Sequence, residues 1–282
     1  MMMRRPESVN GKNRRRRTLW TASLSLILLV SIIALGQALG TEGLDTNLEE
    51  RNQPPSWKHP FGTDWLGRDM LTRTLRGLTV SLGVGLTAST LSAVLGLLLG
   101  LLSATLGSKV DAAITWLIDL FMSLPHMVAL ILISFTLGGG MPGVIASVTA
   151  THWTGLARII RAEVLQIKST DYVQLSARMG RSRVWIARHH ILPHLLPQFI
   201  VGLILLFPHA ILHEAGITFI GIGLSPHQPA VGIILSESMR HLSTGRWWLA
   251  VLPGLSLLVM VKAFDALGES VRTLTDPKTS QE

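Results

Sequence analysis

The sequence predicts an all-α protein with six transmembrane helices, and three observations carry this prediction. The chain has 282 residues, of which 48% are hydrophobic and only 15% are charged. An average soluble domain has about 25% charged residues. The mean hydropathy is +0.43. Several apolar runs reach roughly 20 residues, the length that a helix needs to cross a bilayer. Helices are expected because lipid offers the backbone no hydrogen-bonding partner.

Six stretches are long and apolar enough to be these helices, and they cover residues 19–39, 78–106, 112–136, 143–166, 195–219 and 247–270. The first stretch follows a basic tail, residues 1–18, as the core of a signal peptide would. It is too long for a typical cleaved core and no small-x-small site follows, so we expect it to be retained. Residues 40–77 form the next segment, 78–270 a five-helix core and 271–282 a C-terminal tail.

Basic residues orient the helices in the membrane. Residues 1–17 and residues 158–188 hold seven basic residues each. Six helices place both regions and the C-terminus on one side, which the positive-inside rule identifies as the cytoplasm. Residues 40–77 and 220–246 then lie outside the cell. Gly138-Gly139-Gly140 predicts a tight outer turn, and Pro125 and Pro208 predict kinks within helices.

The composition also excludes several classes of function. The net charge is +8, but the arginines cluster beside apolar runs, so we expect membrane lipid and no nucleic acid as a partner. The chain has no cysteine, which excludes disulfides and thiolate metal sites. It also lacks the Gly-x-x-x-x-Gly-Lys-Ser/Thr loop that cradles nucleotide phosphates, so we do not expect the chain itself to hydrolyse ATP.

Residues 168–193 interrupt the apolar sequence with four arginines and two histidines, which cannot lie in lipid. Small and apolar residues recur there at spacings of 4, 3 and 4, which predicts a stripe on one helical face. We interpret this stripe as a docking surface; the alternative is a solvated basic loop without a partner. A break near Gly180 predicts two short helices, and Pro193 is expected to start the fifth span. The stripe consists of Val173, Ala177, Gly180 and Val184.

This segment resembles the coupling loop of ABC-transporter permease subunits. Gly180 and Ile191-Leu192-Pro193 match the family pattern, whereas its Glu-Ala-Ala positions read Gln174-Leu175-Ser176. The resemblance implies that a partner ATPase docks here. The residues expected to take part in coupling are Tyr172, Val173, Ala177, Gly180, Arg181, Val184 and Pro193.

Four further motifs resemble the second, or "C", subunit of peptide/nickel-type permeases, and the resemblance covers about residues 20–277. The first lies at Gly62-Thr63-Asp64 and Gly67-Arg68-Asp69, where Asp64 and Asp69 are expected to cap helices or to pair with Arg68 and Arg73. The others are Phe219-Ile220-Gly221-Ile222-Gly223, Trp247-Trp248 with Pro253-Gly254, and Gly268-Glu269 with Asp276-Pro277.

Four histidines fall within or beside the predicted spans, and two of them lie one helical turn apart. His209 and His213 share a helix face, and neutral imidazoles at that spacing can ligate a divalent metal such as Ni²⁺. Glu214 follows His213 but points about 100° away. The alternatives are polar packing contacts between helices and peptide handling. The other two histidines are His126 and His152, and the weaker soft ligand candidates are Met122, Met127 and Met260.

The segment Phe207–Gly216 resembles the His-x-x-x-His-x-Ala-Gly pattern of nickel-importing members, as does His152-Trp153. This resemblance implies a substrate path past His209, His213, His152 and Glu214, with nickel, free or chelated, as the cargo. The alternative cargo is a di- or oligopeptide. Two other classes are weaker: no catalytic set supports a membrane enzyme, and no inverted repeat supports an ion-driven transporter.

The resemblance as a whole implies a type I-like ABC importer permease in the inner membrane, with both termini in the cytoplasm. Expected partners are a second, homologous permease that completes a heterodimer, two ABC ATPases and an extracytoplasmic solute-binding protein. The chain itself is expected to be no enzyme and to bind no cofactor, because ATP and Mg²⁺ belong to the ATPases.

Overall fold

The computed structural model describes residues 8–40 and 43–275, and in these ranges the chain is helical with connecting loops. No strand forms there, and one isolated bridge joins Thr63 and Asp69. The all-α prediction is confirmed. The α-helices are α1 (Ser8–Ala38), α2 (Met70–Thr105), α3 (Ser108–Ser123), α4 (His126–Thr136), α5 (Gly140–Lys168), α6 (Asp171–Arg178), α7 (Arg183–Ile186), α8 (Leu192–Phe219), α9 (Val231–Met239) and α10 (Trp248–Thr275). The short helices are η1 (Leu48–Glu50), η2 (Ala187–Ile191) and η3 (Leu242–Thr244).

Four helical stretches of the described chain are long and apolar enough to cross a membrane, and a bent pair makes a fifth candidate. The four are Arg15–Ala38, Met70–Thr105, Arg183–Phe219 and Trp248–Leu274. The pair joins α3 and α4 at an angle of 99°. Helix α5 covers the predicted fourth span but is not among these candidates, because serine, threonine, histidine and arginine interrupt its apolar residues. Six spans therefore remain a prediction.

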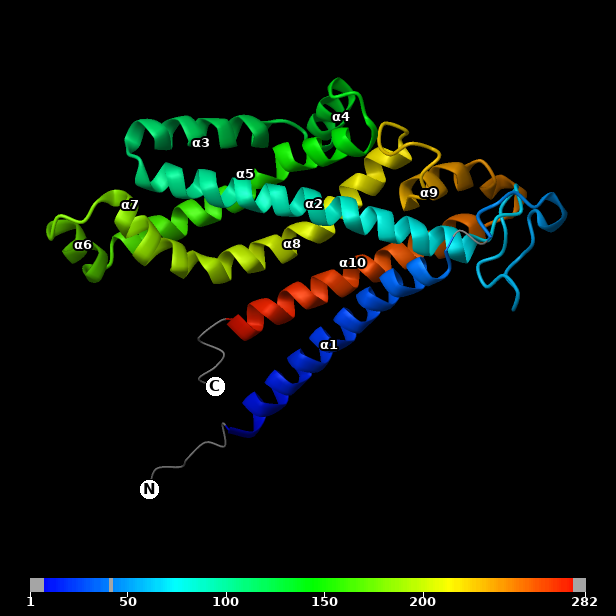
Figure 1. Cartoon of the computed structure of the whole chain (residues 1–282), viewed down its shortest axis with the longest axis horizontal. Helices are drawn as coiled ribbons and strands as arrows, with labels where there is room; N and C mark the ends of the chain where they lie inside the picture. The colour runs from blue at the N-terminus through cyan, green and yellow to red at the C-terminus, as the bar shows by residue number, and fades with distance from the viewer. Residues whose placement is uncertain (1–7, 41–42, 276–282) are drawn as a thin grey trace. The chain divides into compact units, whose positions relative to one another are not determined.

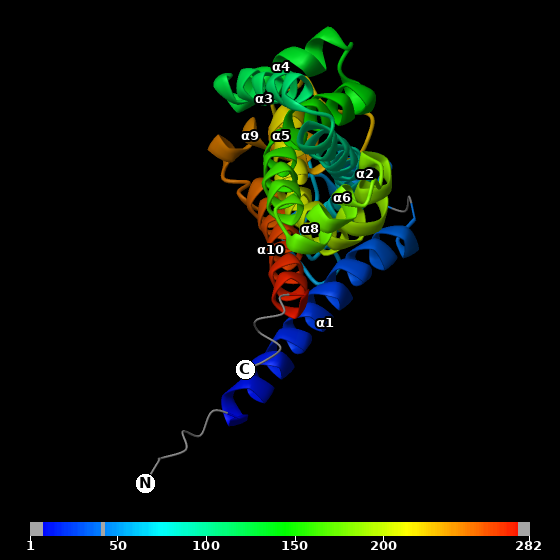
Figure 2. The same cartoon turned by 90° about the vertical axis from the view of Figure 1, so that its left-hand side faces the viewer.

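The chain divides into two compact units, and helix α2 contributes to both. Unit 1 comprises residues up to Val80 together with Pro229 onward, and unit 2 comprises Ser81–Gln228. In unit 1, α1 and α10 run side by side (Figures 1 and 2). A hydrogen bond of 3.1 Å joins the hydroxyl groups of Thr21 and Ser270 across this pair.

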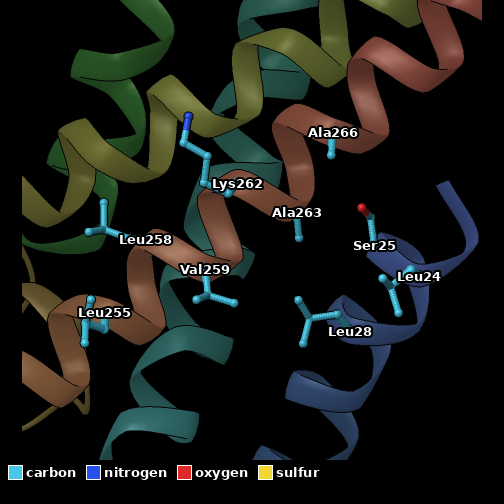
Figure 3. A pocket seen from close by; sticks show the side chains of 9 residues that line it. All are labelled: Leu24, Ser25, Leu28, Leu255, Leu258, Val259, Lys262, Ala263 and Ala266. Carbon is cyan, nitrogen blue, oxygen red and sulfur yellow. The ribbon is translucent and has the colours of Figure 1, made fainter. Parts of the chain in front are cut away.

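An open apolar groove runs between α1 and α10 within unit 1 (Figure 3). Leu24 and Leu28 line it from α1, and Val259 and Ala263 line it from α10. A separate small core of Met70, Ile234 and Leu249 packs α2, α9 and α10 together elsewhere in the unit.

Unit 2 is built around α5, which packs against α2, α4 and α8. Figure 1 shows these helices together with α3 in the green, teal and yellow part of the chain. Gly96 and Gly100 of α2 form a Gly-x-x-x-Gly pair that lets the two backbones approach closely. A Cβ atom on Gly100 would lie 2.7 Å from the carbonyl oxygen of Ala157 on α5. The absence of side chains at these two positions therefore sets the spacing of α2 and α5.

The predicted bend at Pro125 and the predicted turn at Gly138–Gly140 are both present in the structure. Pro125 lies at the break between α3 and α4, where its missing N–H and fixed φ favour a helix start and not a helix interior. Gly138, Gly139 and Gly140 all have positive φ, between 67° and 85°, and form the turn between α4 and α5. Pro208 lies inside α8, as predicted.

One predicted boundary differs from the structure, and the predicted start of the fifth span agrees with it. Helix α2 begins at Met70 and not near residue 78, because the Asp69 carboxylate accepts the N–H of Thr72 at 2.8 Å and caps the helix. Pro193 lies in the first turn of α8, as predicted, although helical structure continues without a gap from Arg183 to Phe219. Residues 1–7 of the basic tail and 276–282 of the C-terminal tail, with Asp276-Pro277, lie outside the described residues.

Candidate functional site

Three histidines from three helices meet in unit 2. The ring centroids of His126 and His152 are 4.8 Å apart, those of His126 and His213 are 4.6 Å apart, and those of His152 and His213 are 5.1 Å apart. One nitrogen of each ring lies within 4.8 Å of the corresponding nitrogens of the other two. We call these three residues the histidine cluster. Side chains at this spacing are close enough to share one divalent ion after small rotations.

Local structure positions each ring of the histidine cluster. His126 is the first residue of α4 and is placed by the break at Pro125. On α5, the Nδ1 atom of His152 lies 3.0 Å from the carbonyl oxygen of Val148, so this nitrogen carries the proton and donates it. The Nε2 atom of His152 then keeps its lone pair for a ligand, the arrangement seen in metal-binding histidines.

The third ring of the cluster belongs to α8 and also contacts a methionine. The Nδ1 atom of His213 lies 3.3 Å from the sulfur of Met127, which follows His126 on α4. Of the soft ligand candidates, Met127 is therefore beside the cluster. Met122 is exposed on α3, and Met260 is buried in the other unit.

The histidine cluster differs from the pair that the sequence suggested. His209 is exposed and is not a member of the cluster. His126 takes its place as the partner of His213. The sequence signal for His126 was present, since it is one of the four histidines near the spans. Nothing in its spacing showed that the α3–α4 break would turn it toward α5 and α8.

Glu214 is fully buried and lies outside the cluster, as its angular offset from His213 suggested. Its Oε1 atom accepts a hydrogen bond of 2.9 Å from the Thr218 hydroxyl. The oxygen of that hydroxyl accepts the backbone N–H of Leu224 at 3.2 Å. Glu214 therefore holds the turn that follows α8. Gly223 is required in this turn because a Cβ atom there would lie 2.1 Å from the Thr218 hydroxyl oxygen.

The basic segment 168–193 contains the two predicted short helices, α6 and α7, separated at Gly180. Gly180 has φ +81°, and its N–H bonds the carbonyl of Ala177 while the N–H of Arg181 bonds that of Ser176. These two bonds form a Schellman motif, which ends α6 and favours glycine at its left-handed position. The Ser182 hydroxyl then accepts the N–H of Trp185 at 3.2 Å and caps α7.

The single stripe predicted for this segment does not form. Val173 is 4% exposed and packs with Ile186 in the core of unit 2, whereas Val184 is 74% exposed. The two valines cannot share a helix face, because the chain reverses at Gly180 between them. Ala177, Gly180, Arg181 and Pro193 are exposed. The exposed apolar side chains of the segment are instead Tyr172, Leu175, Met179 and Val184.

Residues 96–280 match the family model described as "Binding-protein-dependent transport system inner membrane component". The chain belongs to this family. The match covers the histidine cluster and the basic segment together, and it makes the chain a membrane-embedded permease subunit of an ABC importer. In such an importer the partner ATPases hydrolyse ATP, and a solute-binding protein supplies the cargo.

Two relatives of the permease are named as peptide permeases. It is 32% identical to the dipeptide transport system permease protein DppC of Bacillus subtilis over 259 residues, which are 91% of this chain and 81% of the relative. It is 34% identical to a putative peptide transport system permease protein of Brucella suis over 289 residues, covering 98% of this chain and 94% of the relative.

Solved structures support the permease fold. The methionine ABC transporter MetNI, in an inward-facing conformation, matches with a TM-score of 0.61 and 21% identity over 73% of this chain and 98% of that chain. An amino acid ABC transporter matches with a TM-score of 0.55 and 17% identity over 71% of this chain and 92% of that chain. At these identities the likeness concerns the fold alone.

In unit 1 of the permease, an ion network orders the segment before α2. Asp64 is fully buried, and its Oδ2 atom accepts hydrogen bonds of 2.7 Å from both Arg68 and Arg73. Arg73 also donates to Glu237 of α9 at 2.8 Å. The predicted pairing of Asp64 with both arginines is confirmed. The acceptor that joins the network to α9, the Glu237 carboxylate, could not be foreseen because it is remote in sequence.

Proposed function

We propose that this permease carries short peptides, taken from a solute-binding protein, across the membrane. The observation that carries the proposal is the extent of the similarity to peptide permeases, 34% identity over 98% of the chain in one case. Identity at this level over nearly the whole chain includes the helices that line a transport path. Fold likeness alone would not support a cargo, because one fold serves many substrates.

A metal ion or metal chelate is the second candidate cargo, and the histidine cluster favours it. His126, His152 and His213 bring together three imidazoles from α4, α5 and α8, and α8 belongs to a candidate membrane span. Imidazole suits nickel, copper and zinc, and polar side chains within a span are costly unless they serve a path or a neighbouring helix. The relatives reported above are named for peptides, so the nickel hypothesis depends on the cluster and on the His-x-x-x-His resemblance.

The proposed assembly has a second, homologous permease beside this one, so that the transport path forms between the two. Two ATPases dock on the cytoplasmic loops of the permease pair, in this chain mainly on residues 168–193, where the exposed side chains of Leu175, Met179 and Val184 offer an apolar contact. Both termini then lie in the cytoplasm, as the basic residues of the tail and of this segment require. ATP binding moves the docked segment and switches the access of the path.

The cargo is tested by uptake in cells that express or lack this chain together with its partner subunits. Labelled dialanine and radioactive nickel are supplied separately, and accumulation of each is measured. Chain-dependent dialanine uptake that persists in the His126→Ala/His152→Ala/His213→Ala variant supports the peptide proposal. Chain-dependent nickel uptake that this variant loses supports the metal candidate. If neither probe accumulates in a chain-dependent manner, both cargo assignments are wrong.

The ATPase partnership is tested by purification of the tagged permease in a mild detergent. An ATPase should copurify with it, and replacement of Met179 and Val184 by aspartate should release the ATPase without unfolding the chain. These two side chains are each 74% exposed, so the core does not depend on them. An ATPase that stays bound to the doubly substituted permease would place the docking surface elsewhere.

A further inference from the structure

His190 touches both short helices of the basic segment. Its Nε2 atom lies 3.0 Å from the hydroxyl oxygen of Ser176 on α6. Its ring packs edge-on against Tyr172 of α6, with centroids 5.5 Å apart, and against Trp185 of α7, with centroids 5.2 Å apart. One imidazole therefore joins α6 to α7.

The direction of the hydrogen bond follows from its neighbours. The Ser176 hydroxyl donates to the carbonyl of Tyr172 at 2.9 Å, so its oxygen accepts from the Nε2–H of His190. Ser176 stands where the coupling-loop pattern has alanine, which has no hydroxyl. The bond is thus a feature of this chain that the coupling-loop pattern does not supply.

The backbone around His190 is a π-helix, η2, which runs directly into α8. In η2 the N–H of Leu192 bonds the carbonyl of Ala187, five residues earlier. One extra residue in a helical turn rotates the side chains that follow it by about 100°, and such turns are frequent at functional sites.

The neighbouring His189 has contacts different from those of His190. It is exposed, stacks on Trp185 with centroids 4.4 Å apart and bonds the Trp185 carbonyl.

We propose that His190 is a latch that fixes α6 to the start of α8. A displacement of α6 then moves α8 with it as a rigid body. Helix α8 carries His213 and Glu214. His190 is a positioning residue, since it acts through the helices that it joins. The consequence for transport rests on the proposed docking of an ATPase on residues 168–193; the rigid connection itself does not.

The latch is tested by distance measurement on the full chain in lipid nanodiscs. The chain has no cysteine, so spin labels can be placed at will. Leu175→Cys on α6 and Leu196→Cys on α8 are suitable sites, being 59% and 50% exposed. We expect one narrow distance distribution in this labelled parent. His190→Ala and Ser176→Ala should each raise the fraction of molecules whose label-to-label distance lies outside the parent's narrow peak. The expected increase is about fivefold, the change in population that corresponds to one net hydrogen bond.

Two further variants separate the latch from a general structural effect. His190→Gln keeps an N–H donor at a similar position and should restore the narrow distribution. His189→Ala removes the neighbouring imidazole and should leave it unchanged. A narrow distance distribution in the His190→Ala variant would overturn the latch. A distribution that broadens in the His189→Ala variant and in no other variant would also overturn it. Neither result depends on the cargo or on the ATPases.

The coupling consequence is measured in the whole importer complex. The measured quantity is uptake per ATP hydrolysed, with dialanine or nickel as the probe, whichever the parent imports. His190→Ala should lower this ratio by about fivefold, and His190→Gln should restore it. If His190→Ala broadens the distance distribution but leaves uptake per ATP unchanged, the claim that His190 transmits movement from α6 to α8 is wrong.

Discussion

Arg73 and Glu237 form an ion pair of 2.8 Å although 164 residues separate them in the sequence. The Arg73 side chain is only 6% exposed, and its other arm donates to the buried Asp64. Asp64 also accepts the backbone N–H groups of Leu66 and Arg68. The guanidinium of Arg73 thus ties the segment before α2 to helix α9.

Removal of Arg73 is expected to destabilise unit 1. Arg73→Met leaves the Asp64 carboxylate buried with Arg68 as its remaining cation, and loss of one partner from a buried pair costs about 3 kcal/mol or more. The thermal unfolding temperature of the purified permease should fall accordingly. Arg158→Met is the matched control, because Arg158 and Asp119 form an exposed pair that contributes about 1 kcal/mol or less. Equal effects of the two changes would contradict the importance of the network.

Replacement of Gly180 by valine is expected to uncouple ATP hydrolysis from transport. At φ +81° a β-branched residue is strained by about 1–2 kcal/mol, and relief of this strain would change the end of α6. Asparagine tolerates the left-handed region, so Gly180→Asn should retain coupling. No atom lies within 4 Å of a Cβ built at this position, so steric clash is not the cause. Uptake per ATP hydrolysed is the measurement, and an unaffected Gly180→Val importer would refute this role.

His126 is expected to matter for metal handling and His209 is not. If the importer carries nickel, His126→Ala should reduce uptake at least about tenfold, since even a residue that only supports a metal ligand contributes a factor of 10–100. His209→Ala should change uptake little, because His209 lies outside the histidine cluster. Radioactive nickel uptake by the two variants, at equal amounts of permease in the membrane, checks this. The opposite order of effects would restore the His209–His213 pair as the site.

A methyl group at Gly100 is expected to destabilise unit 2. Its Cβ would lie 2.7 Å from the Ala157 carbonyl oxygen and 2.9 Å from the Ile160 Cβ, and overpacking of this kind costs about 1–3 kcal/mol. Gly83→Ala on the same helix is the control, because nothing lies within 4 Å of a Cβ there. Thermal unfolding in detergent should separate the two variants. Equal stability would mean that α2 and α5 can move apart without cost.

Much of the fold could be predicted because it depends on local chemistry. Apolar runs, Pro125 and the three glycines at 138–140 specify helices and breaks through hydropathy and backbone sterics alone. The number of spans was less predictable, since α5 mixes apolar and polar residues and is buried among other helices. Its environment in the folded unit, and not its own hydropathy, makes it a helix of the core.

The candidate site was predicted in part. Sequence spacing selected His213, and the family resemblance selected His152, but spacing paired His213 with His209, which is one turn away on the same helix. Helical periodicity reports neighbours along one helix, whereas His126 and His152 approach His213 from other helices. The docking stripe failed for a related reason, because the Schellman turn at Gly180 places Val173 and Val184 in different surroundings.

The sequence by itself determined the membrane class, the helix breaks, the absence of a nucleotide-binding loop and the basic segment that identifies an ABC permease. These properties follow from composition, charge and motifs that are contiguous in the chain. Only the tertiary structure decided which histidines meet, which side chains of the basic segment are exposed, and that His190, just before α8, contacts both α6 and α7. Such contacts depend on how helices far apart in sequence pack, and packing is set by the shapes and directions of side chains in three dimensions.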